Sequence, residues 1–400
     1  MPECHPSTAS GEDRLARLAL NQAVEPADAA IGRLLERHAP AVVLAAIHDD
    51  RLAELETDPA RRARLADRAA GLRLRLEPGR VEEAVAAADA VGARFLAPGD
   101  PHWPAALDDL GAQRPIGIWA LGCWPPAGVD VISVVGARAC TSYGSYVAGA
   151  VSADLASAGV AVVSGAALGI DAASHRGALA VGGPTVAVLA CGIDRVYPRA
   201  HEVLLRAIAE RGAVLSELPP GATPTRFRFL HRNRVIAALG TGTVVVEAAR
   251  RSGSLVTARL AAELGRVVMA VPGPVTSDQS TGTHELIRDG ATLVTEASQV
   301  REACSSLTAA VPPSSGSEDA SAPPRGPEPE EADPIGQVVI EALPTARAAV
   351  GADVLALARA TGVAPEAVFA ALGRLAATGR VVRVGSGWTL AAPAKAAPRR

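Results

Sequence analysis

The sequence predicts an α/β fold, a doubly wound, Rossmann-like parallel sheet with an N-terminal helical domain and a C-terminal winged-helix domain. Three observations support this prediction. Short apolar runs alternate with helical stretches from Val129 onward. The preceding segment has apolar residues at three- and four-residue spacing, which is typical of helices. The last compact segment has the pattern helix, helix, helix, hairpin.

Composition places the chain among soluble globular proteins. It has 400 residues, of which 49% are hydrophobic, enough for several cores. The first residues lack the basic-then-apolar pattern of a signal peptide, and no run of 18 or more uncharged apolar residues occurs. We therefore expect a cytoplasmic protein without membrane contact. The five cysteines form no C-x-x-C pair and the eight histidines show no metal-binding spacing, so no metal or cofactor is expected.

The first part of the chain divides into two segments. Residues 1–90 are expected to form a small helical bundle, with Asp28 and Pro40 at helix starts. Residues 91–128 are rich in Pro and Gly and are expected to form a packed connector that ends in a strand over Ile116–Leu121.

Residues 129–304 carry the predicted sheet. The runs VISVV, VAVV, TVAVL and TVVVEA are almost wholly apolar, as expected for strands buried on both faces. Helical stretches separate them, which favours a parallel, doubly wound arrangement. Ligands of such sheets bind beyond the carboxyl ends of the strands, so the residues that follow each strand are the candidate site.

The C-terminal part begins with a linker. Residues 305–333 are rich in Pro, Ser and acidic residues and are expected to be disordered. Residues 334–392 follow as the winged-helix domain, and residues 393–400 as a short basic tail. The third helix of this domain has a single basic residue, Arg374, so we expect it to bind a protein partner or, weakly, duplex DNA.

Two turns define the winged-helix prediction. Thr361 and Gly362 form the tight turn before the third helix. Gly385, Ser386 and Gly387 close the hairpin.

Two glycine-containing loops follow the first strands of the sheet. Arg138 comes after VISVVGA and places a forked donor at the strand end. Ser164, Gly165 and Gly169 lie between the strand VAVV and a helix, where backbone N–H groups can hold an anion. Asp171 is a candidate cap of that helix.

A third anion-binding loop follows the strand TVVVEA. Ser252, Gly253 and Ser254 stand at the start of a helix and offer hydroxyl and N–H donors, although Ser254 can equally be a plain cap. Glu247 precedes this loop and is a candidate to orient an arginine or to bind a sugar hydroxyl.

The stretch RFRFLHRNR, residues 226–234, contains four arginines and two of the chain's four phenylalanines. No acidic residue occurs in the sequence between Glu217 and Glu247, so we expect anions to neutralise these arginines. If the helix begins near Phe229, Arg228 and Arg232 share a face. The candidate ligand-binding residues of this stretch are Arg228, Phe229, Arg232, Asn233 and Arg234.

Together these features predict single-stranded nucleic acid as the ligand. The net charge of the chain is −3, so any anion-binding site must be a local patch. Loops and arginines at one sheet edge can follow a chain of phosphates, and phenylalanine can stack a base. The alternative is a solvated basic face whose phenylalanines belong to the core.

Several runs of the chain match the motifs of one known family. VVGARACTSYG matches VG-[SA]-R followed by YG, and residues 164–171 match SG-x-A-x-GID. The run SELPPGATPTRFRFLHRNRVIAAL matches SE, a prolyl stretch and RNR-x-IA-x-L, and VVEAARRSGSLVTARLA and GTHELIRDGA match two further motifs. On these runs the chain resembles the DNA-processing protein A family (DprA, also called Smf). It departs from the family in Leu230-His231, where many members have Pro. It also departs in the run ACGIDRVYPRAHEVL, which corresponds to the family element G-x-G-x-D-x-x-YP but has a single glycine, Gly192, where the family often has two.

The resemblance implies a Rossmann-like core that binds single-stranded DNA, a homodimer, and transfer of incoming DNA to the RecA recombinase in natural transformation. It implies that residues 1–90 are a sterile-alpha-motif-like (SAM-like) domain. Carried over to this sequence, it implies phosphate contacts by Arg138 and by the loop residues, with Asp171 and Glu247 holding the loops in place.

Three other functions are weaker alternatives. A nucleotide-binding enzyme of the phosphoribohydrolase type would carry PGG-x-GT-x-x-E, whereas this chain has LGTGTVVVEAARRSG. A dinucleotide-dependent oxidoreductase would need G-x-G-x-x-G, which VVGARACTSYG does not provide. A transcription regulator would read duplex DNA through the winged helix, whose third helix has little basic charge. We therefore expect no catalytic activity.

Overall fold

The computed structural model describes residues 11–125, 128–309, 334–344 and 351–391. The chain divides into two compact units. The described part of the first unit comprises residues 11–22, 26–36 and 79–309, with the gap at 126–127, and that of the second comprises residues 23–25, 37–78, 334–344 and 351–391. The described part of the predicted helical domain of residues 1–90, which is residues 11–90, is therefore divided between the two units.

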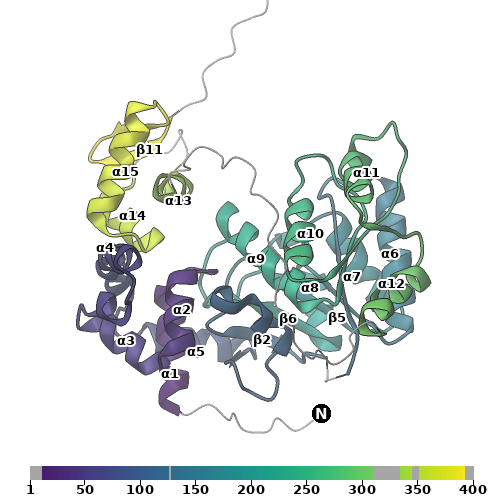
Figure 1. The fold of residues 1–400 in the computed structure, drawn as a ribbon, viewed down its shortest axis with the longest axis horizontal. Helices are drawn as coiled ribbons and strands as arrows, with labels where there is room; N and C mark the ends of the chain where they lie inside the picture. The colour runs from purple at the N-terminus through teal and green to yellow at the C-terminus, as the bar shows by residue number, and fades with distance from the viewer. Residues whose placement is uncertain (1–10, 126–127, 310–333, 345–350, 392–400) are drawn as a thin grey trace, which may run out of the picture. The chain divides into compact units, whose positions relative to one another are not determined.

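The first unit contains a nine-stranded sheet within its described residues, with the order β1-β2-β6-β5-β4-β3-β7-β8-β9 (Figure 1). The strands from β3 to β9 are parallel, whereas β1 and β2 are antiparallel additions at one edge. Their bounds are β1 (Arg94–Leu96), β2 (Ile118–Gly122), β3 (Val131–Val135), β4 (Ala161–Ser164), β5 (Thr185–Leu189), β6 (Ala213–Ser216), β7 (Gly242–Val245), β8 (Val267–Ala270) and β9 (Thr292–Leu293).

The sheet confirms the predicted fold class and corrects two details, the all-parallel sheet and the connector. The doubly wound α/β prediction is confirmed, but the sheet is mixed, because β1 and β2 pair antiparallel. Both strands come from residues 91–128, which we had expected to be a connector with one strand at its end. The connector is therefore part of the sheet.

Helices cover both faces of the sheet. On one face Val131 and Val135 of β3 pack with α9, α10 and η2, and on the other Ile132 and Val134 pack with α6, α7 and α12. The helices of this unit are α1 (Gly11–Ala23), α2 (Ala29–Arg37), α5 (Arg80–Ala90), η2 (Ala105–Gln113), α6 (Ser142–Ser157), α7 (Ile170–Ala180), η3 (Arg199–His201), α8 (Glu202–Arg211), α9 (Arg226–Leu239), α10 (Gly253–Glu263), η4 (Asp278–Ser280), α11 (Thr281–Arg288) and α12 (Ala297–Ala309).

The order of the strands fixes where a ligand can bind. From β3 the chain adds β4, β5 and β6 on one side, and then α9 crosses back so that β7 lies on the other side of β3. The carboxyl ends of β3, β4 and β7 therefore meet at the point where the strand order reverses, which is the usual binding position in such sheets. Because β6 ends at this same edge, α9 begins there.

The predicted helix starts are confirmed. The carboxylate of Asp28 accepts hydrogen bonds from the N–H groups of Ala30 and Ile31, so it caps α2. Pro40 is the first residue of α3, where its missing N–H costs nothing. At the other end of the unit, α12 continues to Ala309, so the first five residues of the predicted linker are helical. The rest of that linker, and the basic tail, lie outside the described residues.

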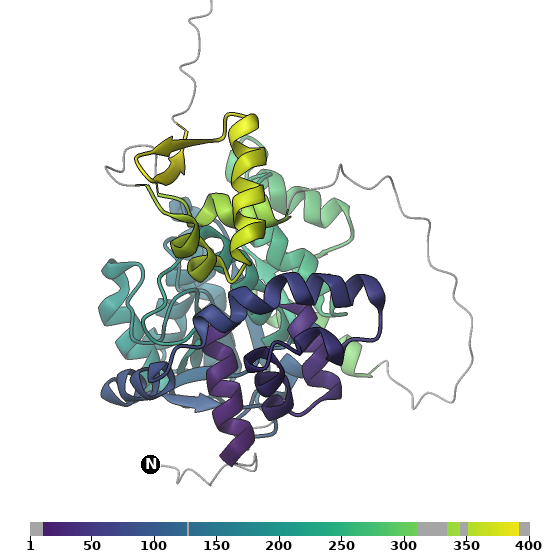
Figure 2. The ribbon, with the colours of Figure 1, turned by 90° about the vertical axis from the view of Figure 1, so that its left-hand side faces the viewer.

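The second unit joins helices from both ends of the chain (Figure 2). Its C-terminal part has the predicted order of three helices and a hairpin, with Gly362 left-handed at φ 68° after the second helix and Gly385 at φ 60° in the hairpin turn. The assignment as a winged helix stays a prediction, as does the SAM-like assignment. The elements are α3 (Pro40–His48), η1 (Leu52–Leu55), α4 (Pro59–Arg75), α13 (Pro334–Ala342), α14 (Val354–Thr361), α15 (Pro365–Ala377), β10 (Val381–Val384) and β11 (Gly387–Leu390).

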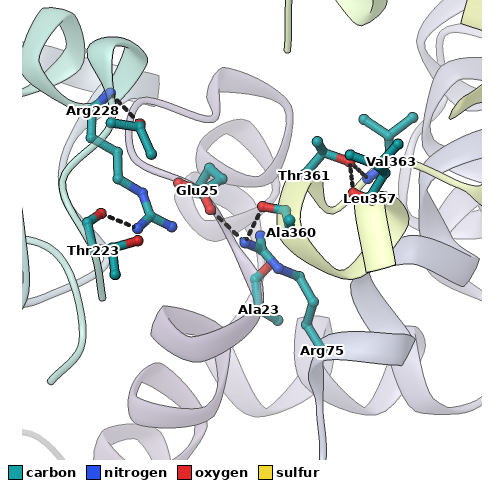
Figure 3. Close-up of polar contacts among 10 residues, drawn as sticks. Ala23, Glu25, Arg75, Thr223, Arg228, Leu357, Ala360, Thr361 and Val363 are labelled. Atoms are coloured by element: carbon teal, nitrogen blue, oxygen red, sulfur yellow. Dashed lines mark hydrogen bonds and ion pairs between the residues drawn. The ribbon is translucent and has the colours of Figure 1, made fainter. Parts of the chain in front are cut away.

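Helix α4 packs closely on the turn between α14 and α15. A Cβ added to Gly71 would lie 2.6 Å from the carbonyl oxygen of Gly362, so only glycine fits at this contact. Arg75 donates to the carbonyls of Ala23 and Ala360 and pairs with Glu25 (Figure 3). The Ala360 carbonyl is in the last turn of α14, where helix carbonyls lack partners of their own.

In the part of the chain that the structure describes, no single helix has the length and apolar composition needed to cross a membrane.

Candidate functional site

The arginine-rich stretch forms the first nine of the 14 residues of α9, which begins at the carboxyl edge of the sheet. The Thr225 hydroxyl accepts the N–H of Arg228 at 3.2 Å and caps the helix. Because of this cap, the helix begins at Arg226, three residues before the start that we had considered.

Three exposed or half-buried side chains form a continuous surface, which we call the aromatic ledge: Arg138, Tyr197 and Phe229. The Arg138 guanidinium carbon lies 4.7 Å from the centre of the Phe229 ring. The rings of Tyr197 and Phe229 are 5.6 Å apart and tilted by 52°, and Tyr197 is 44% exposed. The ledge thus combines a cation with two aromatic rings, which suits a ligand with both negative charge and flat apolar faces.

Arg232 lies beneath this surface and not on it. It is 7% exposed, and its Nη1 donates to the Gly165 carbonyl at 2.7 Å and to the Val188 carbonyl. Burial lowers the pKa of Arg232 to about 10, with nearby Asp171 acting in the opposite direction, so the side chain is charged at neutral pH. A Cβ on Gly165 would lie 2.2 Å from the guanidinium, which explains the glycine at this position. Arg232 therefore supports the loop after β4.

Asp171 holds the same loop from the start of α7. Its Oδ2 accepts the N–H of Gly165 at 3.2 Å and the N–H of Ala167 at 3.3 Å. The side chain is buried, and burial raises the pKa of its carboxyl group, which Arg232 partly offsets. The expected role of Asp171 in holding the loop agrees with this geometry.

The loop after β4 offers fewer donors than the sequence suggested. The Ser164 hydroxyl is fully buried and donates to the Val134 carbonyl at 2.6 Å, and the N–H of Gly165 is used by Asp171. The N–H of Gly165 is therefore not available to a phosphate, in contrast to our expectation, and the Ser164 hydroxyl is not available either. Within the described residues, the N–H groups of Leu168 and Gly169 have no hydrogen-bond partner. They are the donors that this loop can present to an anion.

Arg234 corrects the expectation that no acid neutralises the arginines. It is 2% exposed, and its Nη2 donates to Oε1 of Glu217 at 2.6 Å. Glu217 stands 17 positions earlier in the sequence and is brought to Arg234 by the fold. Arg234 therefore belongs to a buried ion pair and does not line a surface. Arg228 is half-buried, and its Nη1 donates to the Thr223 carbonyl at 2.7 Å (Figure 3).

The N-terminus of α10 lies beside α9. Asn233 donates to the Gly253 carbonyl at 3.3 Å, and the hydroxyl groups of Ser252 and Ser254 are 2.7 Å apart. Ser252 also caps α10 by accepting the N–H of Ser254. Gly253 is exposed, with no atom within 4 Å of the position of a Cβ. This helix start is therefore open to a ligand at Gly253, while both serines have local partners.

Glu247 is a structural residue in this arrangement. It is 1% exposed, and its carboxylate accepts both the N–H of Thr141, at 2.8 Å, and the Thr141 hydroxyl, at 2.5 Å. Thr141 is the N-cap of α6, so Glu247 fixes the start of that helix. Within the described residues, the Glu247 carboxylate makes no hydrogen bond or ion pair with an arginine.

Sequence reasoning chose no candidate site residue from the segment after β5. Tyr197 belongs to the aromatic ledge, and a cavity of about 340 Å³ beside it is lined by Arg195, Val196, Arg199 and Glu202. The rule that ligands bind beyond the carboxyl ends of strands applies to β5 as well. Applied to the run DRVYPR, it would have identified these two arginines and the tyrosine.

Comparisons with known proteins agree with this architecture. The family model described as DNA recombination-mediator protein A matches residues 94–305. A putative DNA processing protein DprA of Mycobacterium tuberculosis is 51% identical over 226 residues, which are 53% of this chain and 57% of that protein. Protein Smf of Escherichia coli is 46% identical over 172 residues, which are 43% of this chain and 46% of that protein.

A solved structure shows the same fold. The X-ray structure of DNA processing protein A from Streptococcus pneumoniae superimposes with a TM-score of 0.59 at 29% identity, and the match covers 73% of this chain and 97% of that one. The chain spans about half the length of the curated relatives described above.

Proposed function

This chain belongs to the family of DNA recombination-mediator protein A, and from that premise we propose that it binds single-stranded DNA at the carboxyl edge of its sheet. The observation that carries the proposal is the aromatic ledge, in which the Arg138 guanidinium lies 4.7 Å from the Phe229 ring. Aromatic rings stack exposed bases of any sequence, and a guanidinium pairs with the phosphate between them.

Each part of the site has a role in this proposal. Phe229 and Tyr197 stack bases, and Arg138 contacts a phosphate. The N–H groups of Leu168 and Gly169 and the open start of α10 at Gly253 receive further phosphates. These donors are kept in place by four buried residues, Arg232, Asp171, Glu247 and Ser164. Asn233 joins α9 to α10.

The ligand is single-stranded because stacking requires bases that are free of a partner strand. In a duplex the flat faces of the bases are covered by their neighbours, so the ledge can contact only the backbone. The expected preference is therefore for single strands, with little dependence on sequence and a strong dependence on salt.

We also propose, from the family, that the chain acts in DNA processing and natural transformation, as a cytoplasmic homodimer that passes single-stranded DNA to a RecA recombinase. In this proposal the chain binds DNA without catalysing a reaction. The phosphoribohydrolase alternative needs an accessible carboxylate, whereas both oxygens of Glu247 are occupied by Thr141 in the buried interior.

The test is a titration of fluorescent single- and double-stranded oligonucleotides of equal length at several salt concentrations. We expect tighter binding of the single strand and a linear fall of log affinity with log salt. Equal affinity for both forms, or release of free base from nucleoside monophosphates, would contradict the proposal.

A further inference from the structure

The loop after β4 has an unusual backbone conformation. Ala166 has φ 51°, one of three non-glycine residues with positive φ in the described part of the chain. It is fully buried, between Gly165, which packs on Arg232, and the loop donors Leu168 and Gly169. Residues other than glycine rarely adopt this conformation and do so where their surroundings hold it, so a neighbouring group must stabilise Ala166.

His201 provides that contact. Its Nδ1 lies 2.9 Å from the Ala166 carbonyl oxygen and, because a carbonyl only accepts, Nδ1 carries the hydrogen. The side chain is 2% exposed, so the bond is protected from water. His201 was not among the residues that we singled out from the sequence, and its distance from Ala166 in the chain is 35 residues.

The position of His201 links two parts of the site. It ends η3, four residues after Tyr197 of the aromatic ledge, and its N–H donates to the Pro198 carbonyl at 2.9 Å. The same short segment thus carries a stacking ring and holds the loop that presents the Leu168 and Gly169 N–H groups. A shift of this segment would move the ring and the loop together.

We propose that His201 is a positioning residue for single-stranded DNA binding: it holds Ala166 in its left-handed conformation and so sets the loop donors against the aromatic ledge. This inference rests on the proposed function. His201 touches no DNA in this account, because its side chain is buried beneath the loop.

The test combines His201→Ala with Ala166→Gly. Loss of one hydrogen bond should weaken single-strand affinity roughly two- to tenfold. The slope of log affinity against log salt should not change, because no phosphate contact is lost, whereas a direct contact would lower the slope by about 0.7. Glycine adopts positive φ without a partner, so Ala166→Gly in the His201→Ala background should restore the affinity.

A matched control is available in the same unit. The Nε2 of His284 also donates to a loop carbonyl, that of Gly273, at 3.0 Å, and His284→Ala should leave single-strand affinity unchanged. If His201→Ala does not fold, as judged by its thermal transition, His201→Leu fills the buried space without a donor and takes its place, both alone and combined with Ala166→Gly.

The outcomes separate the inference from the proposed function. If the unsubstituted protein binds no single strand, the proposed function fails. If it binds but His201→Ala binds equally well, lowers the salt slope, or is not rescued by Ala166→Gly, the positioning role is wrong. Weakened binding at constant slope with rescue supports it.

Discussion

Replacing Arg234 with Ala should destabilise the protein and leave its DNA contacts intact. Sequence alone suggested the opposite, since Arg234 stands in an arginine-rich stretch without nearby acids in the chain. In the fold, Arg234 is 2% exposed and donates to Glu217 at 2.6 Å. The substitution removes the guanidinium that this carboxylate faces and leaves a cavity, while it leaves all three residues of the aromatic ledge in place.

The burial of the pair sets the size of the effect. An exposed ion pair contributes only about 0–1 kcal/mol. Removing one partner of a buried pair costs roughly 3–5 kcal/mol, because the other charge keeps its desolvation cost without its counterion. At about 2 °C per kcal/mol for a unit of this size, the melting temperature should fall by at least roughly 6 °C.

Two measurements on the same variant test this reasoning. Thermal unfolding gives the loss of stability, and single-strand titrations below the transition give the salt slope. Arg206→Ala is the matched control, because it breaks an exposed pair with Glu202 whose side chains are 68% and 62% exposed, and it should shift the melting temperature little. An Arg234→Ala protein with unchanged stability and a salt slope reduced by about 0.7 would refute the reasoning.

Three further predictions follow from the site. Arg138→Ala removes an exposed guanidinium, so the slope of log affinity against log salt for single strands should fall in magnitude by about 0.7. Fluorescence anisotropy at several salt concentrations measures this slope, and an unchanged slope would mean that Arg138 contacts no phosphate. Gly165→Ala should weaken single-strand binding because its Cβ would lie 2.2 Å from the Arg232 guanidinium. Gly373→Ala in α15, where no atom lies within 4 Å of the Cβ position, is the matched control and should bind within about twofold of the original; equal effects would contradict the geometry. The pKa of buried His175 is lowered to about 3, mainly by burial. Between pH 6.5 and 3 the unfolded chain therefore binds a proton that the folded protein does not. As a result, the free energy of unfolding decreases by about 1.36 kcal/mol for each unit by which the pH is lowered. His175→Gln should therefore lose about 2 kcal/mol less than the original protein between pH 6.5 and 5 in urea unfolding; parallel losses would show that His175 is not the titrating group.

The sheet was predictable because its strands are buried on both faces, which leaves near-continuous apolar runs such as VISVV. The short strands β1 and β9 have three and two residues, too few for a pattern. The pairing of α4 with α14 depends on Gly71 and Arg75, whose contacts lie far away in the sequence. No local pattern predicts such contacts.

The site was predictable in its location but not in the exposure of its residues. The strand-end rule led to Arg138, to the loop after β4 and to the start of α10. It could not separate exposed Arg138 from buried Arg232, since the residue type is the same and the sequence does not show which arginine is buried. That difference depends on which face of α9 packs on the sheet, and on acids such as Glu217 that only the fold brings near.

Photochemical cross-linking tests the central claim most directly. A single-stranded oligonucleotide carrying 5-iodouracil reacts with aromatic side chains that stack on the modified base, and mass spectrometry identifies the attached residue. We expect cross-links at Phe229 or Tyr197, which disappear when both are replaced by Leu. Cross-links confined to residues 334–391, or unchanged yields in the double variant, would contradict binding at the aromatic ledge.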